Sequence, residues 1–169
     1  MTALDTPPQT GPLTFDQVVM DLYRDIHKAI RSELFDVTLT AGRTDPSDST
    51  ARHALAAHVS DVASLLIEHA EHEDGAIQPV LEKELPDLAE GIEHDHHTLE
   101  ARIEGLRDMA ATDVVSPATG GERRSLHRLY IELASFTSAY LAHQDVEERV
   151  VMPALQTAVG VEECVAIHG

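Results

Sequence analysis

The sequence predicts an all-α protein, folded as an up-down-up-down four-helix bundle. Long segments repeat apolar residues every three or four positions, and none shows the strict alternation of a β-strand. Aromatic residues make up only 4% of the chain, so the core must consist mainly of Leu, Ile, Val and Ala, which suits helix packing. The chain has 169 residues and fits one domain. Short connections between the segments favour antiparallel neighbours.

The first predicted helix begins at Thr14, which is spaced to form a capping box with Gln17. Its apolar stripe consists of Phe15, Val19, Leu22, Ile26, Ile30 and Leu34. The turn-rich segment GRTDPSDST ends this helix. The second predicted helix begins near Thr50, and Pro79 and Pro86 bracket its end. Its stripe consists of Leu55, Val59, Val62, Leu66, His69, Glu73 and Ile77.

The third predicted helix opens with Asp87 and Glu90, whose charges suit the positive end of a helix. Its stripe consists of Leu88, Ile92, His96, Leu99, Ile103 and Leu106. Residues 113–121 are rich in Pro and Gly and are predicted to form a loop. The fourth helix follows and fades before Gly160. Its stripe consists of Leu126, Leu129, Leu133, Phe136, Tyr140, His143, Glu147 and Val151.

Three parts of the chain are predicted: a disordered leader rich in Pro and Thr (residues 1–13), the bundle (14–157) and a C-terminal tail (158–169). The net charge of −18 argues against binding to nucleic acid or to anionic membranes. No apolar run could span a membrane, and the leader does not resemble a signal peptide. Because Cys164 is the single cysteine, no internal disulfide forms. We therefore expect a cytoplasmic protein, whose oligomeric state stays open.

Two of the apolar stripes contain a histidine and a glutamate where apolar residues are expected. His69 and Glu73 form one pair, His143 and Glu147 the other, and both fit the pattern H-x-x-x-E-[DE]-x-x-[IV]-x-P-[VA]-L. A spacing of four places the two side chains ~5–6 Å apart on one face of a helix. A buried carboxylate without a partner is costly, so these pairs predict a bound cation in the core.

The other two helices each add one histidine at a matching place. His27 and His96 both share a helix face with apolar residues three and seven positions later. His94 and His97 lie beside His96, and the choice among the three stays open, although only His96 falls on the stripe. The predicted metal ligands are His27, His69, Glu73, His96, His143 and Glu147.

Four imidazoles and two carboxylates suit iron, manganese or zinc better than copper(I) or an iron–sulfur cluster. Six ligands are too many for one tetrahedral zinc ion. If both carboxylates bridge two metals, each metal receives two imidazoles and two carboxylate oxygens. A bridging oxo or hydroxo group would add a fifth donor and leave one open position. Open positions on two iron ions would bind O2, NO or peroxide as small ligands.

The order and spacing of these residues resemble the hemerythrin-like family, or HHE cation-binding domains, over residues 14–157. The resemblance implies a di-iron centre held by those same six residues. It also implies an up-down-up-down bundle, the fold of myohemerythrin. Oxygen-carrying hemerythrins have two histidines four apart on the third helix, whereas Ile92 and Glu100 lie at that distance from His96. Their fourth helix uses His-x4-Asp, whereas this chain has His143-x-x-x-Glu147. In this respect the chain is more similar to hemerythrin-like domains of iron–sulfur repair proteins and of bacterial proteins that consume peroxide.

Three functions stay open, and no catalytic residue is assigned. The first is a di-iron protein that binds or reacts with O2, NO or peroxide. The second is a di-iron enzyme, such as a catalase-like peroxidase or an oxidase. The third is an iron- or zinc-binding module for sensing or interaction. A ferritin-like oxidase is rejected, because its sites use Glu-x-x-His on two helices, whereas among the four predicted histidine ligands only His96 has a glutamate, Glu93, three residues before it. Tyr140, one turn before His143, is either a donor to a bound ligand or a core tyrosine.

Overall fold

The computed structural model describes residues 11–168, which form helices and, within that range, no β-strand. The all-α prediction is therefore confirmed. The long helices are α1 (Arg24–Arg43), α2 (Ser49–Ala76), α4 (Pro86–Met109) and α5 (Glu122–Val146). The shorter elements are η1 (Phe15–Gln17), α3 (Gln78–Glu84), η2 (Ala110–Val114), η3 (Glu147–Val151), α6 (Met152–Val159) and α7 (Val161–His168).

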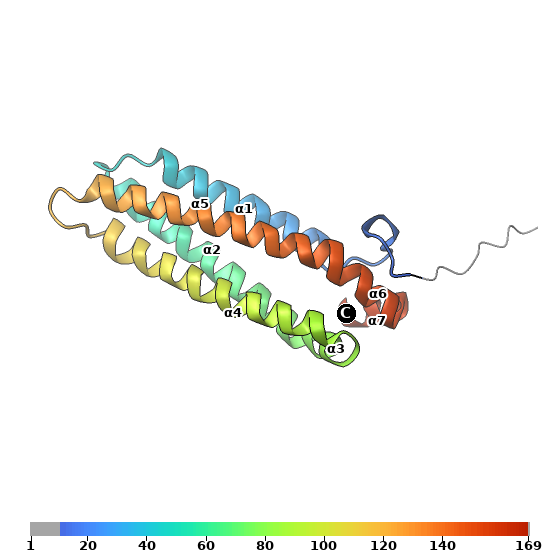
Figure 1. Ribbon diagram of the computed structural model, residues 1–169. Coiled ribbons are helices and arrows are strands. Elements are labelled where there is room, and N and C mark those ends of the chain that lie inside the picture. Colours follow the sequence, from blue (N-terminus) through green and yellow to red (C-terminus); the bar gives the residue numbers. More distant parts are fainter. Residues whose placement is uncertain (1–10, 169) are drawn as a thin grey trace, which may run out of the picture.

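The long helices α1, α2, α4 and α5 lie side by side, and α3, α6 and α7 gather at one end of them (Figure 1). Helix α1 contacts both α2 and α5, and α4 contacts the same two helices. This ring of contacts encloses a common axis, onto which each long helix turns its apolar stripe. Burying one Leu or Ile side chain on that axis contributes roughly 1.5–3 kcal/mol.

Two apolar clusters fill the axis. The larger one lies along the length of the bundle and includes Ile30, Leu34, Leu55, Val59, Leu66, Leu99, Ile103, Leu129, Leu133, Phe136 and Tyr140. The smaller one lies toward the end with α3, α6 and α7 and includes Tyr23, Ile77, Leu81, Ile92, Val151, Met152, Leu155 and Cys164. Along the chain, the predicted ligands of each long helix come between residues of one cluster and residues of the other, some of which lie just beyond the helix end. The sequence therefore places the polar groups in a layer between two apolar regions.

The start of the first helix differs from the prediction. Helix α1 begins at Arg24, and the capping box of Thr14 and Gln17 instead caps η1, a single 3-10 turn. The amide of Thr14 donates to Gln17 Oε1 at 2.8 Å. Phe15 and Val19, predicted to be buried, are 40% and 73% exposed. The apolar residues before Arg24 therefore do not form the buried face of a helix.

A long-range contact explains why the chain before α1 is not helical. The amides of Val19 and Met20 both donate to Gln156 Oε1 at 3.0 Å, so they are not available to a helix that starts at Thr14. Asp21 then caps the true helix, because its carboxylate accepts from the amide of Arg24 at 3.1 Å. Sequence spacing alone does not show this contact.

Each His-x-x-x-Glu motif has a proline six residues after its glutamate, and this proline has a structural effect at both places. Pro79 lies in the first turn of α3, immediately after the break at Ile77. Pro153 follows η3, a stretch of π-helix in which the amide of Met152 donates to the carbonyl of Glu147. A proline ring clashes with the carbonyl four residues earlier, which favours a wider turn. Wide turns of this kind often occur at functional sites.

The structure describes part of the predicted leader, and it shows a helix in the predicted tail. Of the predicted leader, residues 1–10 lie outside the described part of the chain. The predicted tail contains α7, in which Cys164 is buried. Gly160, the residue before α7, has a positive φ of 86°, which glycine adopts readily. Within the described residues, no single helix has the length and apolar character to cross a membrane. The bent pair Glu122–Val159 and Val161–Ile167 passes that test by length and composition alone.

Candidate metal centre

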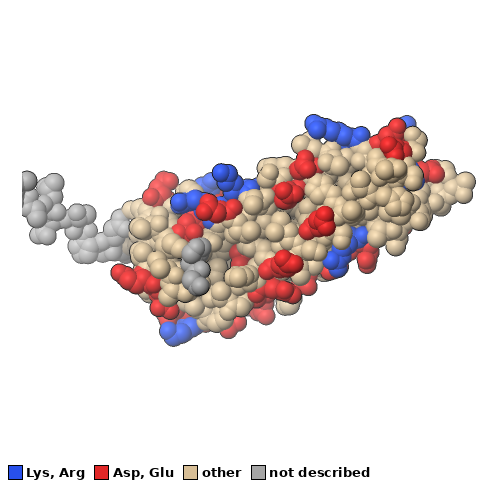
Figure 2. Space-filling view, turned by 180° about the vertical axis from the view of Figure 1, so that it is seen from behind, with Lys and Arg blue, Asp and Glu red and all other residues tan. Residues whose placement is uncertain are grey.

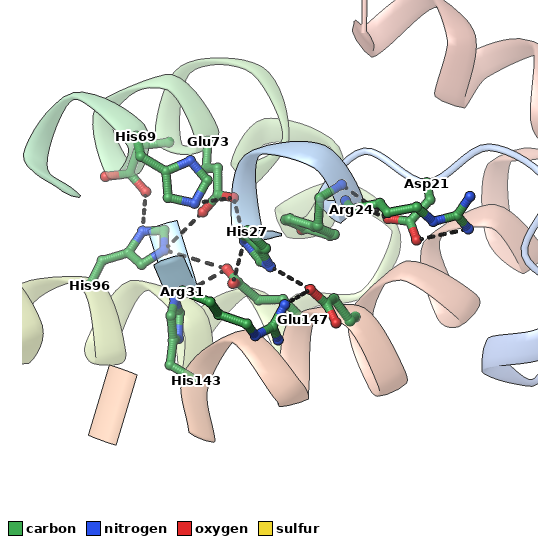
Figure 3. Close-up of polar contacts among 12 residues, drawn as sticks. Asp21, Arg24, His27, Arg31, His69, Glu73, His96, His143 and Glu147 are labelled. Atoms are coloured by element: carbon green, nitrogen blue, oxygen red, sulfur yellow. Dashed lines mark hydrogen bonds and ion pairs between the residues drawn. The ribbon is translucent and has the colours of Figure 1, made fainter. Parts of the chain in front are cut away.

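All six predicted ligand residues lie together in the layer between the apolar clusters (Figure 3). Each is at most 9% exposed, and the four long helices together with η3, which continues α5, supply them. They are His27 on α1, His69 and Glu73 on α2, His96 on α4, His143 on α5 and Glu147 at the start of η3. The regular helical spacing of four brings each glutamate onto the same face as its histidine.

Glu73 contacts three histidines with its two oxygens. Its Oε1 lies 3.1 Å from Nε2 of His69 and 3.7 Å from Nε2 of His27. Its Oε2 lies 3.3 Å from Nε2 of His96. The carboxylate therefore presents one oxygen to the histidines of α1 and α2 and the other to the histidine of α4.

Glu147 divides its oxygens in the same way. Its Oε2 lies 3.4 Å from Nε2 of His27. Its Oε1 lies 3.2 Å from Nε2 of His143 and 3.6 Å from Nε2 of His96. Two half-sites result. The first half-site contains His27 and His69, the second contains His96 and His143, and each receives one oxygen from each glutamate.

The polar atoms of this layer are buried without hydrogen-bond partners. They include Nε2 of His27, His69 and His96 and all four carboxylate oxygens of Glu73 and Glu147. Each unsatisfied buried polar atom costs roughly 1–3 kcal/mol, so the protein alone leaves this layer strongly unfavourable. Ligand atoms within each of two overlapping groups of these residues lie within 4.8 Å of one another. The donor set therefore fits bound metal ions, with nitrogen and oxygen donors only.

The charges in the layer compensate one another. Burial tends to raise the pKa of Glu147, but contacts with His143 and His96 outweigh it and lower that pKa to about 2. Burial tends to lower the pKa of His96, but contacts with Glu147 and Glu73 raise it to about 11. Without a cation, a protonated His96 therefore balances the Glu147 carboxylate. Metal binding replaces such protons, because an imidazole must be neutral at the ligating nitrogen.

Two further carboxylates orient histidines from outside the layer. His96 Nδ1 donates to Asp74 Oδ1 at 2.7 Å, and His27 Nδ1 donates to Glu148 Oε1 at 3.0 Å. Glu148 also accepts from Arg31 at 2.6 Å. Such contacts fix the tautomer that leaves Nε2 facing a metal. No role for Asp74 or Glu148 was evident from the sequence, although both occupy the acidic [DE] position that the two motifs share.

The two half-sites differ in one outer contact. His143 Nδ1 lies 3.5 Å from Asp95 Oδ2, at ion-pair distance. Asp95 comes immediately before His96 in the sequence, and the matching residue before His27 is Ile26, which has no carboxylate. In the second half-site both histidines therefore contact an outer carboxylate, whereas in the first, within the described part of the chain, only His27 does.

A tyrosine lies beside each half-site. The ring of Tyr23 is 5.0 Å from that of His27, and the ring of Tyr140 is 5.8 Å from that of His143. Burial raises the pKa of both tyrosine hydroxyls well above the usual value, and the two glutamates of the layer raise it further. Both hydroxyls therefore remain protonated and can act as donors. Tyr140 is the one that the sequence singled out.

The remaining histidines near the motifs lie outside the layer. Of the three neighbours on α4, His96 is buried whereas His94 and His97 are exposed. His58 lies on α2 with its Nε2 3.6 Å from a carboxylate oxygen of Glu33. His72 is exposed, as a solvated histidine would be.

The helical fold and the buried histidine–glutamate cluster define an all-helical protein with a centre that could hold metal. The chain belongs to the hemerythrin family: the model of the hemerythrin HHE cation binding domain matches residues 18–155. The family predicted from the sequence is thereby confirmed. No curated protein and no solved structure matched the chain.

Proposed function

We propose that the six residues hold two iron ions and that this centre binds or reacts with O2, NO or peroxide. The observation that carries the proposal is the division of oxygens in Glu73 and Glu147, each of which faces both histidine pairs (Figure 3). A carboxylate in that position can bridge two ions. Two imidazole nitrogens and two carboxylate oxygens for each ion suit iron. A single tetrahedral zinc ion would leave donors unused.

Iron bound in this layer would supply Lewis acidity and electron transfer. The chain fixes the conditions for that chemistry. Asp74 and Glu148 hold His96 and His27 with Nε2 toward the layer, and the two apolar clusters close the layer toward both ends of the bundle. The Tyr140 ring lies beside His143, and its hydroxyl stays protonated because burial raises its pKa, so it offers a hydrogen-bond donor near the second half-site.

The proposal includes the up-down-up-down arrangement of the four long helices. Its support is the ring of contacts in which α1 and α4 each touch both α2 and α5. An arrangement with short connections between successive helices brings all four ligand-bearing faces to the same layer. The ligands then meet at one level, although they come from positions far apart in the chain.

Metal analysis and spectroscopy test the proposal. Metal-free protein is loaded with iron(II) without oxygen, washed, and assayed for iron per chain and for absorption after adding O2, NO or peroxide. We expect two irons per chain and a spectral change with at least one of the three ligands. One iron per chain, or a preference for zinc without any such change, would contradict the proposal and favour a sensing or interaction module.

Peroxide separates an enzyme from a binding protein. Rapid oxygen evolution after peroxide is added to the iron-loaded protein would indicate a catalase-like enzyme. A stable spectral change that reverses when O2 is removed, without turnover, would indicate a protein that binds its ligand. The same sample serves both measurements, and a variant without metal provides the background.

A further inference from the structure

One side of the proposed metal centre is connected to solvent by a cavity of about 470 Å³. The inner wall of the cavity includes His69 and Glu73, which are 9% and 7% exposed. Its outer wall includes the exposed residues Asp25, Glu68 and His72. The cavity therefore connects the surface with ligand residues of the first half-site.

The cavity at the second half-site is much smaller than the cavity at the first. The cavity beside His96, His143 and Tyr140 has a volume of only about 20 Å³. A divalent ion with about six waters of ~30 Å³ each occupies on the order of 180 Å³. A hydrated ion therefore fits the cavity at the first half-site but not the one at the second.

The charge of the larger cavity favours a cation. Its wall carries the carboxylates of Asp21, Asp25, Glu68 and Glu73, and no Lys or Arg is among the residues that line it. Figure 2 shows acidic side chains spread over the face seen from behind, with basic side chains in a few small groups. The whole chain has a net charge of −18. A cleft lined by one sign of charge raises the local concentration of the opposite ion.

The acidic residues of the cavity have different roles. The Asp21 side chain is only 6% exposed, pairs with Arg24 at 3.3 Å and caps the start of α1. Asp25 and Glu68, on α1 and α2, are exposed at the mouth. His72 is four residues after Glu68 and three after His69, so these side chains lie along one side of α2. They form a path from the mouth to the first half-site.

We propose that this cavity is the route by which metal ions reach the centre. The inference rests on the proposed metal site. Asp25 and Glu68 draw the hydrated cation from solvent, and His72 passes it inward to His69 and Glu73. There it meets donors that lack a hydrogen-bond partner, Nε2 of His69 and Oε1 of Glu73. The ion loses its water only where these ligands replace it.

The test measures the rate of metal uptake. Metal-free full-length protein is mixed with cobalt(II) in a stopped-flow instrument, and cobalt absorption is followed at low ionic strength. The double variant Asp25→Asn/Glu68→Gln is expected to load about five- to tenfold more slowly than the unmodified protein, with the same final cobalt content. The difference should shrink at high salt, because exposed charges are screened.

A matched control removes two charges from the same helices away from the cavity. Asp36→Asn/Asp61→Asn has the same change in net charge, and both residues are exposed. We expect it to load at nearly the rate of the unmodified protein. Equal rates for the two double variants would overturn the route and leave the metal centre intact. Absence of cobalt binding in the unmodified protein would overturn both.

A second variant tests the width of the cavity instead of the charge at its mouth. Ile167, on α7, forms part of the cavity wall. Ile167→Trp narrows the cavity and should slow both uptake of cobalt and its release to a chelator, while the final content is unchanged. Thermal unfolding checks that the variant is folded. Unchanged uptake and release rates in a folded Ile167→Trp protein would contradict the route.

Discussion

Replacing the outer carboxylates separates the proposed half-sites from each other. Asp74→Asn retains the shape of the side chain but removes the charge that accepts from His96 at 2.7 Å. Glu148→Gln does the same for His27, whose contact is 3.0 Å long. Because the two acids orient histidines of different half-sites, Asp74→Asn should weaken the second half-site and Glu148→Gln the first.

The size of each effect follows from the surroundings of the acid. Loss of an outer carboxylate typically weakens metal binding by ~10–100-fold. The Asp74 side chain is 51% exposed, so water can partly replace it, and we expect about tenfold, or ~1.4 kcal/mol. The Glu148 side chain is 16% exposed and also binds Arg31, so we expect nearer ~100-fold, or ~2.7 kcal/mol.

Competition against a chelator of known affinity measures both effects. Each variant is titrated with cobalt(II) or anaerobic iron(II), and the two binding steps are fitted separately. Glu93→Gln is a suitable control, because its side chain is 61% exposed and contacts only the exposed His97 among the histidines of α4. The reasoning is refuted if Asp74→Asn binds both ions as tightly as the Glu93→Gln control does.

Other predictions concern the ligands and the metal itself. His69→Ala and His143→Ala should each lose at least one metal, whereas His127→Ala should lose none; equal metal content in all three would refute the ligand assignment. Glu73→Gln and Glu147→Gln should each weaken both ions together, since each carboxylate faces both half-sites, and loss of one ion alone would contradict this. Removing metal should lower thermal stability: at a metal concentration of about 100 Kd, one site contributes ~2.7 kcal/mol, which corresponds to roughly 5–10 °C in a calorimetric scan. Identical unfolding temperatures with and without chelator would argue against a metal that stabilises the fold.

The long helices could be predicted because their apolar residues are periodic and their ends carry local signals. Pro86 opens α4, and Gly121 comes immediately before α5. The start of α1 could not be predicted, because it depends on Gln156, which accepts from two amides more than a hundred residues earlier in the chain. A local capping box at Thr14 is real but caps only a single turn. Local signals thus identified the four long helices but not α3 or α7, and a distant contact decided where α1 begins.

The clustering of the six residues was predictable, because polar side chains interrupt the apolar stripes and the helical periodicity indicates which residues share a face. The outer acids gave no such signal. Asp74 and Glu148 each lie one position off the stripe, where periodicity predicts solvent, and each contacts a histidine on a different helix. The cavity beside His69 was also unpredictable, since its wall combines α1, α2 and the α7 side chain of Ile167. Contacts of this kind depend on how the helices pack.

The crossed placement of the glutamates joins the two halves of the chain. Glu147, on the C-terminal half, is needed beside His27, and Glu73, on the N-terminal half, is needed beside His96. A fragment that ends after α3 would hold two imidazoles and one carboxylate, too few to complete either half-site. Such a fragment could bind metal fully only by docking with a second helical hairpin. Each bound ion would therefore tie three of the long helices together: α1, α2 and α5 at the first half-site, and α2, α4 and α5 at the second, where η3 continues α5. Detachment of α2 or of α5 would open both coordination spheres at once.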